Sequence, residues 1–176
     1  GTARVYLGEH TYMHRRVAIK VLHDELTESS SFLERFYRES RTAAVLDHEN
    51  IVRAFDIDCH DNLHYLVMEF VDGPTLEQLV EQQGVLGYEQ ATDYLRQAAL
   101  GLQEAHSAGL VHRDVKPGNL MLTPNNVVKV LDLGMALDRN EAESLTLMHN
   151  ESMLGTADYL APEQALDSHT VDPRAD

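Results

Sequence analysis

The segment 112–119, with the sequence HRDVKPGN, constrains this chain more than any other feature. It follows a long stretch with helical spacing of apolar residues and precedes an apolar stretch typical of a strand. Asp114 and Lys116 are two residues apart, and Asn119 comes five residues after the aspartate. A carboxylate that can act as a base, a cation that can bind phosphate and an amide that can bind a metal ion are therefore expected to converge on one phosphoryl group. This pattern predicts a catalytic loop.

Three further motifs lie along the chain, namely VAIK at 17–20, DLG at 132–134 and APE at 161–163. Each is weak alone, because a strand that ends in lysine or a tripeptide turn is common. Together and in this order they resemble the signature of the protein kinase family, whose catalytic loop has the form H-R-D-L-x-x-x-N. The flanking sequences GTADYLAPEQ and LVMEFVDG resemble bacterial members of the Ser/Thr kinase family. The resemblance covers essentially the whole chain.

The resemblance implies an α+β fold with two lobes. We expect a small antiparallel β lobe with one helix at 1–70 and a mainly helical large lobe at 71–176. Residues 1–5 match only the second half of the family's glycine-rich loop, and the family has further helices after the APE motif. We therefore expect an incomplete kinase domain that ends at the start of the central helix. In the family, the residue matching Asp176 anchors the backbone of the catalytic loop.

Local sequence patterns predict the secondary structure in more detail. Alternating apolar residues and turn residues predict strands at 5–7, 16–22, 51–58, 63–70, 119–122 and 127–131. Helical spacing predicts helices over 32–46 and 88–107, with Gly109 just past the second. Thr75 and Gln78 form a capping-box pattern that opens a shorter helix ending at Gly84.

The resemblance assigns roles at the phosphate end of an ATP site. It implies that Lys20 binds the α and β phosphates and is held by Glu39. Glu34 lies on the same predicted helix, but Glu39 has the family's spacing to the LDHENIV sequence. Asp132 and Asn119 are expected to bind Mg²⁺, which prefers oxygen ligands.

Two of the catalytic-loop residues have implied roles in the transfer itself. Asp114 would accept the proton of the substrate hydroxyl, and Lys116 would steady the γ-phosphate. Lys116 and Thr156 also match positions that distinguish Ser/Thr kinases from tyrosine kinases. Arg113 matches an arginine that pairs with a phosphorylated activation loop, for which the candidate sites are Ser144, Thr146 and Ser152.

At the adenine end, Val5 and Ala18 are expected to line the nucleotide site by the same resemblance. Met68 matches the gatekeeper position, and the backbone of Glu69 and Val71 would hydrogen-bond the base. Residues 69–72 are expected to be the hinge, the connection between the lobes. One departure from the family is Ala3, which replaces the third glycine of the loop and adds a methyl group near the phosphates.

Composition limits the partners of the chain. The formal net charge is −15, which argues against a nucleic-acid surface because phosphate contacts need clustered cations. The single cysteine, Cys59, cannot form an internal disulfide, which fits a reducing cytoplasmic setting. No stretch approaches the roughly 18 apolar residues that span a bilayer, so we expect no membrane contact within this segment, whatever anchors the parent protein elsewhere.

The expected function is transfer of the ATP γ-phosphate to Ser or Thr hydroxyls of a protein substrate. Two alternatives stay open. The first is a pseudokinase or ATP-binding signalling scaffold, which loss of Lys20, Asp114 or Asp132 would favour, but all three are present. The second is a small-molecule kinase of the aminoglycoside type, against which Lys116 and the APE segment count.

Overall fold

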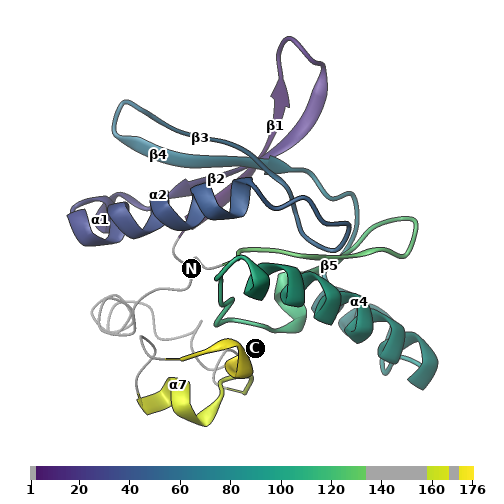
Figure 1. Ribbon diagram of the computed structural model, residues 1–176. Helices are drawn as coiled ribbons and strands as arrows, with labels where there is room; N and C mark the ends of the chain where they lie inside the picture. The colour runs from purple at the N-terminus through teal and green to yellow at the C-terminus, as the bar shows by residue number, and fades with distance from the viewer. Residues whose placement is uncertain (1–2, 134–157, 167–170) are drawn as a thin grey trace.

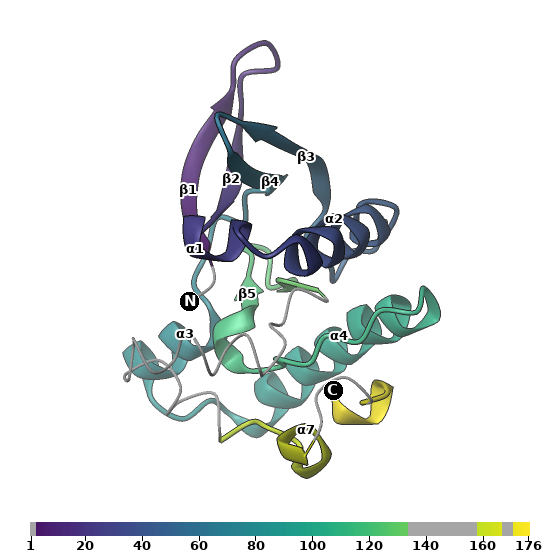
Figure 2. The same ribbon diagram turned by 90° about the vertical axis from the view of Figure 1, so that its left-hand side faces the viewer.

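The computed structural model describes residues 3–133, 158–166 and 171–176 (Figure 1). An antiparallel sheet with a helix against it lies above a second layer that is mainly helical (Figure 2). Each layer has its own apolar core, one around Phe32, Phe36 and Leu66, and the other around Leu102, Val128 and Val130. The α+β, two-lobed arrangement expected from the sequence is confirmed.

The small lobe contains four antiparallel strands in the order β1-β2-β4-β3. Their bounds are Ala3–His10 (β1), Arg15–Leu22 (β2), Ala54–His60 (β3) and Leu63–Glu69 (β4). The third strand begins at Ala54 rather than at the predicted residue 51. Ile51 instead forms a parallel bridge with Val130 of the large lobe, because it is buried in that core at 2% exposure.

Two helices follow β2. α1 (Asp24–Thr27) was not expected, and α2 (Ser30–Ala44) begins and ends two residues before the predicted bounds. The hydroxyl of Ser29 accepts a hydrogen bond from the backbone N–H of Phe32 and so caps α2. Phe32 and Phe36 are buried in the core under the sheet.

The large lobe begins with α3 (Leu76–Gln83) and α4 (Tyr88–Ser107). The capping box of Thr75 and Gln78 forms as predicted, as does the helix end at Gly84. The remaining elements are η1 (Pro117–Asn119), β5 (Leu120–Leu122), β6 (Val128–Val130), α7 (Pro162–Leu166) and η2 (Pro173–Ala175). No helix in the described ranges combines the length and apolarity needed to cross a bilayer.

Residues 50–53 tie the two lobes together. The backbone N–H of Val52 donates to the carbonyl of Val130 (3.0 Å), and the N–H of Val130 donates to the carbonyl of Asn50 (2.8 Å). The buried side-chain amide of Asn50 also donates to the carbonyl of Val128 (2.9 Å). α4 passes this segment at Gly101, where an added Cβ would lie only 2.7 Å from the Asn50 carbonyl oxygen. A side chain at position 101 would therefore push α4 away from the junction.

Candidate active site

The catalytic loop brings the three predicted side chains together. The ammonium of Lys116 lies 2.8 Å from Oδ2 of Asp114. The amide nitrogen of Asn119 donates to the same carboxylate oxygen (2.8 Å) and to the carbonyl of Asp114 (2.7 Å). The short turn η1 sets this arrangement, since the N–H of Asn119 donates to the carbonyl of Lys116 (2.9 Å). A cation and an amide thus hold one carboxylate in a fixed orientation.

The buried side chain of His112 joins this loop to the strand that leads to Asp132. The N–H of Asp114 donates to Nδ1 of His112 (3.2 Å), so the proton of the neutral ring is on Nε2. Nε2 then donates to the carbonyl of Leu131 (2.7 Å). Arg113 and Asp132, on either side of this link, both have left-handed backbone, with φ values of 67° and 57°. Such conformations are uncommon outside glycine and cluster at functional sites.

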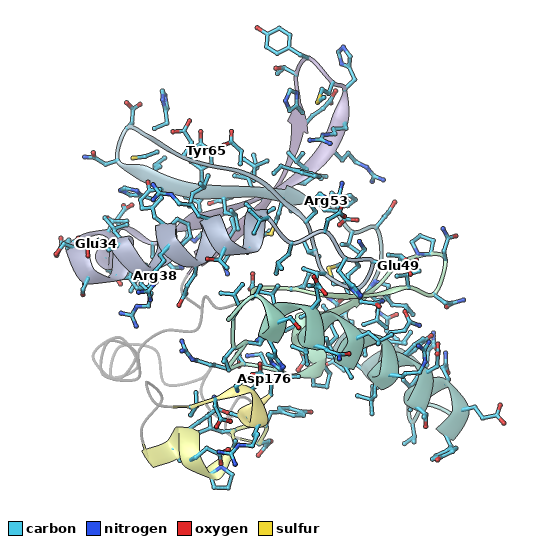
Figure 3. All side chains as sticks on the ribbon, viewed as in Figure 1. Glu34, Arg38, Glu49, Arg53, Tyr65 and Asp176 are labelled. Carbon is cyan, nitrogen blue, oxygen red and sulfur yellow. The ribbon has the colours of Figure 1, made fainter. Side chains whose placement is uncertain are left out.

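The carboxylate of Asp176, which is labelled in Figure 3, supports the catalytic loop from below. This fully buried side chain accepts hydrogen bonds from the backbone N–H groups of His112 and Arg113, both at 2.7 Å. Nε2 of His106 on α4 lies 2.8 Å away. The anchoring role expected for Asp176 is confirmed.

Sequence reasoning missed a second support of the same loop. The buried side chain of Gln164 on α7 donates to the carbonyl of Arg113 (2.7 Å) and accepts from the N–H of Ala161 (3.1 Å). The sequence shows Gln164 directly after the APE motif, but nothing in that motif predicts a contact with the catalytic loop.

We expect Asp176→Ala to lower the free energy of unfolding by about 3 kcal/mol, because it leaves two backbone donors of the loop without a partner. Chemical denaturation followed by circular dichroism measures this change. Asp72→Ala is the matched control, since Asp72 pairs with Arg16 on the surface and such pairs contribute about 0–1 kcal/mol. Equal effects of the two substitutions would contradict the anchoring role.

Lys20 lies on β2 and is 5% exposed. Its ammonium forms an ion pair with Oδ1 of Asp132 at 2.8 Å. The small lobe therefore supplies a cation, and the large lobe supplies an anion, at the same point between the lobes. In phosphoryl-transfer sites, a lysine ammonium binds a nucleotide phosphate and an aspartate carboxylate binds the accompanying metal ion.

Glu39 on α2 forms an ion pair with Nη1 of Arg113 in the catalytic loop (3.9 Å). Lys20 in turn pairs with Asp132. The expected pairing of Glu39 with Lys20 stays a prediction. The Nε of Arg113 is buried and has no hydrogen-bond partner among the described residues.

Burial raises the pKa of Glu39 from its ordinary value of 4.5 to about 7, and the guanidinium groups of Arg113, Arg35 and Arg38 oppose this rise. Figure 3 shows Arg38 on the side of α2 that faces away from the sheet. The carboxyl group therefore changes its charge near neutral pH.

We expect the raised pKa to make the fold less stable as pH increases. Between pH 4.5 and 7 the folded state holds a proton on Glu39 that the unfolded state has released, so the free energy of unfolding falls, by up to about 3 kcal/mol. Glu39→Gln should remove this part of the pH slope. Glu34→Gln, on the exposed part of the same helix, is the matched control. Urea unfolding at pH 5 and pH 8 measures the slope, and an unchanged slope in Glu39→Gln would contradict the assignment.

The adenine-end residues lie on the strands and on the connection after β4. Ala18 of β2 faces Met68 of β4 across the ladder, and Val5 of β1 faces Lys20 of β2. Met68 and the nearby Val71 are buried. Val5 is 60% exposed, so its side chain is accessible to a ligand. Thr156 and the candidate phosphosites Ser144, Thr146 and Ser152 lie outside the described residues.

The fold and the charged groups between its lobes define a protein kinase domain. The chain matches the family profile described as "Protein kinase domain" over residues 1–176, and it belongs to this family. Its relatives include a probable serine/threonine-protein kinase of Clostridium acetobutylicum, which is 42% identical over 165 residues (94% of this chain and 25% of the relative). Another is serine/threonine-protein kinase PknB of Mycobacterium leprae, which is 41% identical over 180 residues (100% and 28%).

A solved structure supports the same grouping. The chain aligns with the crystal structure of the Mycobacterium tuberculosis PknI kinase domain with a TM-score of 0.77 and 29% identity. The alignment covers 99% of this chain and 64% of that one. The chain thus spans well under half the length of these curated relatives and about two-thirds of the solved domain.

Proposed function

We propose that the protein is a serine/threonine protein kinase that transfers the γ-phosphate of ATP to a hydroxyl group of a protein substrate. The observation that carries the proposal is the meeting of Asp114, Lys116 and Asn119 in one hydrogen-bonded loop, in a chain of the protein kinase family. Phosphoryl transfer needs positioned reactants and neutralised charge more than covalent chemistry from the protein.

Asp114 is the proposed base. Its carboxylate is held by Lys116 and Asn119, which fixes the direction from which it accepts the proton of the attacking hydroxyl. Lys116, 25% exposed in its side chain, can hold its ammonium toward a γ-phosphate oxygen as well as toward Asp114. The short distance between base and cation supports their action on the same phosphoryl group.

Asp132 and Asn119 are the proposed ligands of a divalent ion, which we propose to be Mg²⁺. The donor set fits a hard cation, since it consists of a carboxylate and an amide oxygen. Asn119 uses its nitrogen for both hydrogen bonds to Asp114, and its oxygen accepts none among the described residues. The ion would neutralise charge on the phosphates. Asp132 would then exchange its present partner Lys20 for that ion.

Lys20 is the proposed partner of the α and β phosphates, and its release from Asp132 would leave it available to Glu39. Val5, Ala18 and Met68 would enclose the base, which the backbone of Glu69 and Val71 would bind. The antiparallel register that sets Ala18 opposite Met68 supports this placement. We also propose lobe bounds at 1–70 and 71–176, which the end of the four-stranded sheet at Glu69 supports.

Lys116 and Thr156 are the basis for proposing Ser/Thr rather than Tyr substrates. The named relatives are serine/threonine-protein kinases, which supports the same choice. A cytoplasmic location stays a prediction. No observation favours a pseudokinase, since Lys20, Asp114 and Asp132 are all present and the first and last form an ion pair.

The test is incubation of the full protein with γ-labelled ATP, Mg²⁺ and a generic protein substrate, followed by phosphoamino-acid analysis. We expect label on serine and threonine and none on tyrosine. Label on tyrosine would contradict the substrate class. Nucleotide binding without any transfer would favour the scaffold alternative.

A further inference from the structure

Lys129 on β6 is the one lysine of three that lies outside the proposed reaction. Its ammonium lies 3.0 Å from Oε2 of Glu69 and 3.4 Å from the carbonyl oxygen of Ile51. The lysine side chain is 14% exposed, and that of Glu69 is 31% exposed. This ion pair connects β6 of the large lobe with the last residue of β4 in the small lobe.

Glu69 is held from a second direction as well. Its Oε2 accepts a hydrogen bond from the backbone N–H of Arg53 (3.2 Å), and its own N–H donates to the carbonyl of Arg53 (2.8 Å). Figure 3 shows Arg53 where the strands of the small lobe approach the large lobe. One carboxylate oxygen therefore links three segments, namely the end of β4, residues 51–53 and β6.

The three segments lead to the two ends of the proposed nucleotide site. Glu69 is the first residue of the connection whose backbone would bind adenine. Lys129 lies on β6, three residues before Asp132, the proposed metal ligand, which follows the end of that strand. The backbone bond between Val52 and Val130 keeps residues 51–53 beside β6. The ion pair thus joins the adenine end to the metal end through a few hydrogen-bonded residues.

A second ion pair in the same region provides a contrast. Arg16 and Asp72 pair at 2.8 Å, but their side chains are 56% and 63% exposed. Water screens such a pair, and its loss has little effect. The Lys129–Glu69 pair is better shielded and shares its atoms with two backbone groups, so its loss leaves those groups without charged partners.

We propose that Lys129 is a positioning residue that sets the distance between the adenine-binding backbone at 69–71 and the carboxylate of Asp132. The inference rests on the proposed function of the nucleotide site. A ligand that spans both ends needs the correct distance between them, whereas a ligand that occupies only the adenine end does not.

The test compares two ligands in the full protein. Lys129→Met should weaken binding of a non-hydrolysable ATP analogue with Mg²⁺ about tenfold, as expected for a coupled contact. Binding of adenosine, which lacks phosphates, should change less than twofold, and kcat at saturating ATP should stay within twofold. Lys129→Arg keeps the charge and should recover most of the affinity. Arg16→Met is the matched control and should leave the affinity for both ligands unchanged.

A double-mutant cycle with Glu69→Gln checks that the two residues act as a pair. The amide of the Glu69→Gln variant would keep an oxygen for the N–H of Arg53, so this variant keeps a testable fold if Lys129→Met is unstable. The double variant should lose no more affinity than either single variant. The inference would be overturned if the losses of affinity in the two single variants added up in the double variant. It would also be overturned if Lys129→Met weakened binding of the analogue and of adenosine equally, or bound the analogue within twofold of the unchanged protein. An unchanged protein that binds the analogue but transfers no phosphate would contradict the proposed function alone.

Discussion

Asp114→Asn is expected to lower kcat for phosphoryl transfer about a thousandfold, within the range for removal of a positioned general base. The amide has nearly the size of the carboxylate and keeps an oxygen for Lys116, 2.8 Å away in this structure. It cannot take up the proton of the attacking hydroxyl. Binding of the ATP analogue should change by less than about threefold, because Asp114 is itself a proposed ligand of neither the phosphates nor the metal ion.

Initial rates with labelled ATP, together with calorimetric binding of the analogue, separate these two effects. Asp93→Asn is the matched control, because Asp93 is a carboxylate on α4 that pairs with Arg96 at the surface. We expect the control to match the unchanged protein. Turnover by Asp114→Asn within tenfold of the control would contradict the role of Asp114 as base.

Asp132→Asn is expected to lower kcat/KM for ATP at least about a thousandfold, for a different reason. The proposed metal site loses its carboxylate, so more Mg²⁺ is needed for the ATP analogue to bind. Lys20 also loses its ion pair with Asp132, while its side chain remains 6% exposed. Removal of one partner of a buried ion pair is unfavourable, so the free energy of unfolding should fall by about 1–3 kcal/mol.

A Mg²⁺ titration of analogue binding distinguishes the two aspartates. The concentration for half-maximal binding should rise in Asp132→Asn and stay unchanged in Asp114→Asn. Asp93→Asn again serves as control. The same Mg²⁺ dependence in all three variants would show that Asp132 does not bind the metal ion.

Short-range patterns predicted much of this structure. The capping box at Thr75, the end of α3 at Gly84 and the bounds of α4 all follow from a few neighbouring residues, and the structure has them as predicted. The catalytic loop was predictable for the same reason, since the spacing of Asp114, Lys116 and Asn119 closes one hydrogen-bonded turn.

Contacts between distant segments were predicted less well. The ion pair between Glu39 and Arg113 depends on how α2 is oriented against the catalytic loop, and no motif of the sequence predicts that orientation. The Lys129–Glu69 pair joins residues sixty apart and belongs to no motif. The start of β3 was misplaced because Ile51 is apolar in either setting, and only the bridge to Val130 shows that it belongs to the large-lobe core.

Arg113 and Asp132 both have left-handed backbone, so the proposed activity and the stability of the fold place conflicting demands on these two residues. Each conformation costs about 1 kcal/mol or more for a residue with a side chain. Glycine at either position would relieve that strain, yet it would also delete the guanidinium that meets Glu39 or the carboxylate that meets Lys20. Relief of the backbone strain and retention of the charged groups therefore exclude each other at these two positions.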